Sequence, residues 1–85
     1  MKKKQPRKTV HGKIFGHTIG SVCRRLGKEG LSVEQVTKIL KARGFETKPL
    51  TIRFNVNSGN GDGHYYGEPA DLTHQQLAEL AKYLA

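Results

Sequence analysis

Hydrophobic residues recur at helical spacing in three stretches of this chain. The first stretch predicts a helix from about residue 15 or 18 to residue 28, with Arg24, Arg25 and Lys28 turned away from its apolar face. Gly27 and Gly30 mark the expected end of this helix. Its apolar face is formed by Ile19, Val22, Cys23 and Leu26.

The second helix has clear signals at both ends. Ser32 and Gln35 have the spacing of a capping box, and Leu31 and Val36 occupy the positions of a hydrophobic staple. Gly44 supplies the left-handed residue that commonly follows a helix. The apolar stripe consists of Val36, Ile39 and Leu40.

The last helix, over residues 73–84, begins in the same way. Thr73 and Gln76 form a second capping box, with Leu72 and Leu77 at the staple positions. Its narrow stripe is simplest to interpret as the intramolecular face of the helix, and a homodimer contact is the alternative. The stripe consists of Leu77, Leu80, Ala81 and Leu84.

Residues 50–57 show two patterns at once. Leu50, Ile52, Phe54 and Val56 alternate with polar residues, which is typical of a half-buried strand. Such a strand would pair with residues 64–66 across the loop "SGNGDG" and form a β-hairpin in an α+β fold.

The same segment also fits a helix. Ile52 and Val56 are one turn apart and would pack against Val36 and Leu40, while Leu50 and Phe54 would point outward. The ends of such a helix are marked by a capping residue, a first-turn proline and a final glycine, which are Thr47, Pro49 and Gly59. Both interpretations stay open at the level of sequence.

Charge is distributed unevenly along the 85 residues, whose formal net charge is +8. Residues 1–13 carry six Lys or Arg and no acid, and residues 14–58 carry eight against three glutamates. Residues 59–85 carry one lysine against four acids. The chain therefore presents a positive surface suited to a polyanion and a mildly acidic remainder.

Several other classes of protein are disfavoured. No apolar run approaches the roughly 20 residues of a membrane span, so no membrane association is expected. The single Cys23 indicates a reducing, cytoplasmic environment, or the nucleoid in a prokaryote. The four histidines lack metal-ligand spacing, and no nucleophile is paired with a base, so we expect no metal, no cofactor and no enzyme activity.

The stretch "LSVEQVTKILKARGFETKPLTIRFNVNSG" resembles a helix-turn-helix unit, and the following "GNGDGHYYGEP" is similar to the wing of winged helix-turn-helix domains. The resemblance covers residues 15–67 and implies a mainly α fold with a small β-hairpin, in which a three-helix core is followed by a C-terminal helix. The expected organisation is a flexible basic arm at residues 1–12 and one winged-helix-like domain at 13–85.

This resemblance implies a double-stranded DNA-binding protein, either a transcriptional regulator or an accessory factor of a mobile element. The recognition helix would present Thr51, Arg53, Phe54 and Asn57, and the wing would present Asn60, His64 and Tyr65. Phosphate contacts are expected from the basic residues Lys2, Lys3, Lys4, Arg7, Lys8, Lys13, Arg24, Arg25 and Lys48.

Two other functions are compatible with the sequence. If residues 50–57 form a strand, Arg53, Asn55 and Asn57 lie on one face near Tyr65, as in an RNA-binding or ribosome-associated protein. If Leu50 and Phe54 are exposed, they can dock a protein partner, as in an interaction adaptor.

Overall fold

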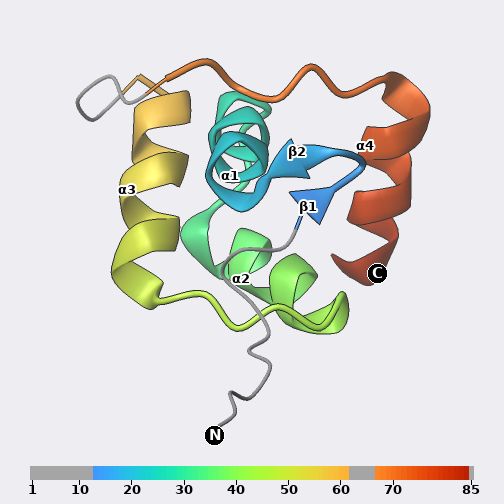
Figure 1. Ribbon diagram of the computed structural model, residues 1–85, viewed down its shortest axis with the longest axis horizontal. Coiled ribbons are helices and arrows are strands. Elements are labelled where there is room, and N and C mark those ends of the chain that lie inside the picture. Colours follow the sequence, from blue (N-terminus) through green and yellow to red (C-terminus); the bar gives the residue numbers. More distant parts are fainter. Residues whose placement is uncertain (1–12, 62–66, 85) are drawn as a thin grey trace, which may run out of the picture.

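The computed structural model describes residues 13–61 and 67–84 and is mainly helical, with one small β-hairpin in the described part. This confirms the expected fold class. Figure 1 shows α3 and α4 on opposite sides of the molecule, with α1, α2 and the hairpin between them. No helix among the described residues has the length and apolar character needed to cross a membrane.

The hairpin precedes the first helix. Strands β1 (Lys13–Ile14) and β2 (His17–Thr18) pair antiparallel through a two-residue turn. Phe15 and Gly16 form that turn, and both have positive φ, at 54° and 82°, which is the geometry that suits a tight hairpin. The Phe15 ring lies 5.1 Å from the guanidinium carbon of Arg43, so a cation–π contact accompanies this backbone conformation.

Helix α1 (Ile19–Lys28) begins later than the earliest expected position. Thr18 is its N-cap and accepts a hydrogen bond from the backbone N–H of Ser21. Gly30 has a φ of 97° and follows the helix as expected, but Gly27 lies inside α1 and is buried there. The prediction that Gly27 ends the helix is wrong, and its role lies in the packing described below.

Helix α2 (Val33–Ala42) matches its sequence signals. The reciprocal capping box of Ser32 and Gln35 is present, and Gly44 follows the helix with a φ of 90°. The predicted stripe is buried, and Phe45 donates its backbone N–H to Leu40 O at 2.9 Å. This bond closes the C-terminus of α2 in the manner of a Schellman motif.

Helix α3 (Pro49–Gly59) settles the ambiguity of residues 50–57. The alternative strand at 50–57, paired with 64–66, is wrong, because every residue from 49 to 59 is helical. The alternation of apolar residues has a different cause: Ile52 and Val56 are buried, whereas Leu50 and Phe54 are exposed to solvent.

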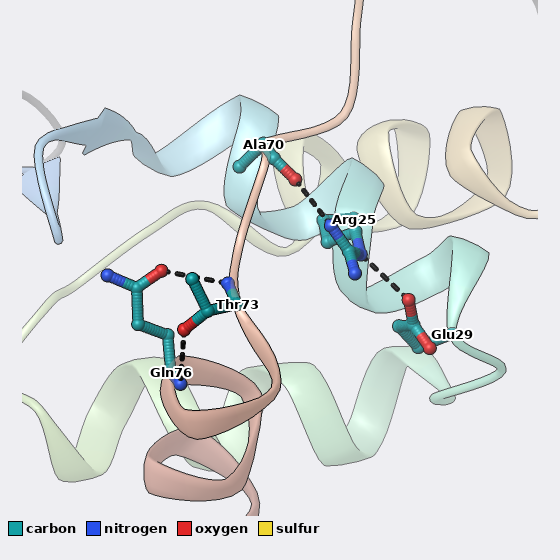
Figure 2. Close-up of polar contacts among 5 residues, drawn as sticks. All are labelled: Arg25, Glu29, Ala70, Thr73 and Gln76. Atoms are coloured by element: carbon teal, nitrogen blue, oxygen red, sulfur yellow. Dashed lines mark hydrogen bonds and ion pairs between the residues drawn. The ribbon is translucent and has the colours of Figure 1, made fainter.

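Helix α4 (His74–Ala81) continues into a short 3-10 helix, η1 (Lys82–Leu84). The capping box of Thr73 and Gln76 is present (Figure 2). Leu80 is fully buried, and Leu77 and Leu84 pack partly against the core. The three leucines of the expected stripe therefore face the interior of the protein, whereas Ala81, its fourth residue, is exposed.

The hydrophobic core of the described part draws on strand β1, on all four α-helices and on the segment that precedes α4. Ile14 comes from the hairpin, and Ala70 and Leu72 come from the connecting segment (residues 67–72) between α3 and α4. The helices contribute the remaining buried residues, which are Ile19, Val22, Cys23, Leu26, Val36, Ile39, Leu40, Ile52, Val56 and Leu80.

Candidate nucleic-acid interface

Helix α3 has one face in the core and one in solvent. Ile52 and Val56 are 2% and 1% exposed and anchor the inner face. Leu50 and Phe54, at 59% and 52% exposed, are the two exposed large hydrophobic residues of the described part. The exposed residues Lys48, Thr51 and Arg53 accompany this apolar pair, and Asn57 is half-buried one turn further on.

The inner face of α3 packs most extensively against α1, and two glycines make this close approach possible. A Cβ at Gly27 would lie 2.2 Å from Val56 O, and a Cβ at Gly59 would lie 1.8 Å from Arg24 O. Gly59 is indeed the last residue of α3, but its small size is required because the α1 backbone lies against it. The main packing partner of α3 is α1, whereas the sequence pattern had indicated Val36 and Leu40 of α2.

The N-terminus of α3 has no side-chain cap. The N-cap residue is Lys48, which makes no capping hydrogen bond, and Pro49 fills the first turn. The predicted capping role of Thr47 is wrong, because its buried hydroxyl has no hydrogen-bond partner and the helix starts one residue later. No acidic residue lies in the first turn, so the positive end of the helix dipole is left uncompensated.

Arg24, expected to contact nucleic acid, connects three elements of the fold. Its Nη1 donates to Asn55 Oδ1 at 2.6 Å, and its Nε donates to Glu68 O at 3.1 Å. Asn55 Nδ2 in turn donates to Thr51 O on α3. Arg24 thus ties α1 to α3 and to the connecting segment, and these donors are engaged within the protein.

Arg25 has a similar internal role (Figure 2). Its Nη1 donates to Ala70 O at 3.1 Å, and its Nε forms an ion pair with Glu29 Oε2 at 2.7 Å. The backbone N–H of Ala70 donates to Ser21 O, so both backbone polar groups of the buried residue Ala70 have partners on α1. The connecting segment is therefore held on α1 by backbone and arginine contacts.

The other expected contact residues lie in several places. Lys13 is exposed on β1, and Asn60 is exposed directly after α3. The expected basic arm and the expected wing residues His64 and Tyr65 lie outside the described residues. The arm residues concerned are Lys2, Lys3, Lys4, Arg7 and Lys8.

The charges on the two sides of the molecule differ. From residue 47 to residue 61 the chain carries Lys48 and Arg53 and no acid. Helix α4, on the side of the molecule away from α3 (Figure 1), carries Glu79, whose charge is balanced by an ion pair with Lys82 at 3.1 Å. The outward face of α3 is therefore suited to approach a polyanion.

Cys23 lies on the inner face of α1, in the hydrophobic core, and is fully buried. Burial raises the pKa of its thiol to about 12 and outweighs the charge of Arg24, which acts to lower it. A thiol held neutral in this way is a packing residue, because the thiolate is the reactive form.

The contact between Arg24 and Asn55 was not predicted from the sequence. Asn55 had been placed on a polar strand face, although it is the partner of Arg24 across 31 residues. Leu50 and Phe54, in contrast, lie on the outward face of α3, as the sequence predicts for a helix at these positions. Comparison of the chain with protein-family models, with curated proteins and with solved structures found no match.

Proposed function

We propose that this protein binds double-stranded DNA and that the outward face of α3 is the surface that meets the duplex. The observation that carries the proposal is the composition of this face, which combines exposed cations and polar side chains with the absence of acid. A helix is about 10–12 Å wide and the major groove of B-DNA is about 12 Å wide, so such a face can enter the groove.

Phosphate attraction would supply most of the affinity. Lys48 and Arg53 are exposed on α3, and the basic residues 1–13 add further cations to the chain. The uncapped N-terminus of α3 adds backbone N–H groups and the positive end of the helix dipole beside Lys48. Each phosphate that these groups neutralise releases counterions, so binding should weaken steeply as salt rises.

The polar groups next to these cations suit the edges of bases. Thr51 and Asn57 carry a hydroxyl and an amide, and an amide can pair with the N6 and N7 atoms of adenine. A role as a transcriptional regulator or as an accessory factor of a mobile element is consistent with such binding, and the proposal assigns the protein no catalytic step.

The RNA-binding alternative loses the arrangement on which it depended. It required Arg53, Asn55 and Asn57 on one face of a strand, but Asn55 is bound to Arg24 on the inner side of a helix. The adaptor alternative keeps a specific observation, which is the exposure of Leu50 and Phe54, and it becomes an outcome of the tests below.

A duplex-binding titration at two salt concentrations tests the proposal. Wild-type protein should bind duplex DNA with an affinity that falls steeply with salt, and Lys48→Ala with Arg53→Ala should reduce the logarithmic salt slope by about 2. Lys82→Ala is the matched control, because Lys82 is exposed on η1 and contacts Glu79. Absent binding, or binding that is insensitive to salt, would refute the proposal.

A further inference from the structure

Leu50 and Phe54 are large apolar side chains that α3 places at the surface of the protein. Their spacing of four residues places the two side chains one above the other on α3, with more than half of each exposed. Asn57 follows one turn further along the same face. The result is a short apolar ridge with a carboxamide at its end.

The surroundings of this ridge favour a polyanionic partner that also offers apolar contacts. The exposed Lys48 lies two residues before Leu50, and the exposed Arg53 directly precedes Phe54. No acid occurs between residues 47 and 61. A second copy of the chain would bring the same cations against each other.

Duplex DNA offers an apolar group in the major groove, the C5 methyl of thymine. On the proposed DNA-binding function, on which this inference rests, we infer that Leu50 and Phe54 bind thymine methyl groups and that Asn57 binds the adenine of an A·T pair. The partner of α3 is therefore duplex DNA whose major groove presents thymine.

The size of the effect follows from the area of one methyl group. Removing water from one methylene-sized group favours association by about fourfold. Leu50 and Phe54 together can cover one or two methyl groups, so the preference for thymine should lie between about fourfold and fifteenfold. The phosphate contacts of Lys48 and Arg53 are the same for any base sequence and should leave this ratio unchanged.

Replacement of thymine by uracil tests the inference directly, since uracil keeps the base pair and lacks only the methyl group. The full chain is titrated with three duplexes of equal length. The first has a mixed A·T sequence, the second has the same sequence with every thymine replaced by uracil, and the third has a G·C sequence. We expect the thymine duplex to bind at least about fourfold more tightly than the uracil duplex.

Variants then assign the effect to the ridge. Leu50→Ala with Phe54→Ala should bind the thymine and uracil duplexes equally, near the affinity of wild-type protein for uracil. Arg53→Ala is the matched control and should weaken binding to both duplexes while keeping their ratio. Because Leu50 and Phe54 are exposed, the double variant should keep the circular dichroism spectrum of the wild-type protein.

The possible results are distinct. Equal binding of the thymine and uracil duplexes by wild-type protein would overturn this inference and leave the proposed DNA binding intact. Absent binding to all three duplexes would overturn both. Sedimentation equilibrium adds a third result. If wild-type protein binds both duplexes equally and self-associates, and the double variant does not self-associate, the inference is overturned and the ridge is a contact between copies.

Discussion

Helices α2 and α3 follow one another in the chain and have nearly the same length, yet their sequences satisfy different requirements. In α2, the capping box, the apolar stripe and the C-terminal glycine all serve the stability of the helix. In α3, the N-terminus is uncapped and two large apolar side chains face solvent. Sequence features that folding does not require are expected where a protein meets its partner.

The strongest test of this comparison concerns the buried side of α3. Gly27→Ala and Gly59→Ala should each destabilise the fold by about 3 kcal/mol or more, because the new methyl group would overlap the backbone of the facing helix. Gly20→Ala is the matched control: its methyl group would meet no atom closer than 3.5 Å, and alanine favours the helix. Urea unfolding followed by circular dichroism measures all three, and equal midpoints would contradict this packing.

The two arginines Arg24 and Arg53 should separate stability from binding. Arg24→Met should lower the free energy of unfolding by about 1–2 kcal/mol, because it removes bonds to Asn55 and Glu68. Arg53→Met should change stability by less than about 0.5 kcal/mol, since Arg53 is exposed, while it weakens DNA binding. Chemical denaturation measures the stability of both variants, and duplex titration measures their binding. A loss of stability in Arg53→Met without a loss of binding would contradict these roles.

The helix N-termini provide a comparison of intermediate size. Ser32→Ala should destabilise the protein by about 1 kcal/mol, because it removes the cap of α2. Lys48→Ser should stabilise it by up to about 1 kcal/mol by supplying a cap to α3, and should weaken DNA binding. Thermal unfolding and anisotropy titration measure the two effects. Lys82→Ser is the control for the lost positive charge. If Lys82→Ser weakens DNA binding as much as Lys48→Ser does, then Lys48 makes no local contact with DNA.

Cys23 provides a comparison that depends on pH. The pKa of its thiol is about 12 in the folded protein and has an ordinary value of 9.0, so the unfolded chain loses this proton first as pH rises. The stabilising contribution is complete below about pH 9 and declines toward pH 12. The loss of stability between about pH 8 and about pH 10.5 should therefore be larger for wild-type protein than for Cys23→Ala. An equal loss in both proteins would show that Cys23 does not contribute.

The sequence predicted α2 and α4 closely because their signals are local. A capping box or a C-terminal glycine acts within one turn, so its partners are neighbours in the sequence. Gly30 acts in the same way after α1, whereas the cap that Thr18 supplies to this helix was not predicted. The hairpin at residues 13–18 was not predicted, because its turn places Phe15 at positive φ, a conformation that is unusual for this residue type.

Residues 50–57 remained ambiguous because distant contacts decide their conformation. β-branched residues and asparagines disfavour a helix. However, Gly27 and Gly59 each lie close to the backbone of the facing helix, and Arg24 donates to Asn55, so α3 is held on α1. These contacts join residues about 30 positions apart, so no local pattern contains them. Arg24 and Arg25 were assigned to nucleic acid for the same reason, since their acceptors Glu68 and Ala70 lie far along the chain.

The most direct test of the account is a map of amide chemical shifts during titration with duplex DNA. Using uniformly ¹⁵N-labelled protein, we expect the largest shift changes at residues 48–61, with α4 and the buried side of α1 nearly unchanged. Changes concentrated on α4, or a spectrum that duplex DNA leaves unaltered at low salt, would contradict the claim that the outward face of α3 is the binding surface.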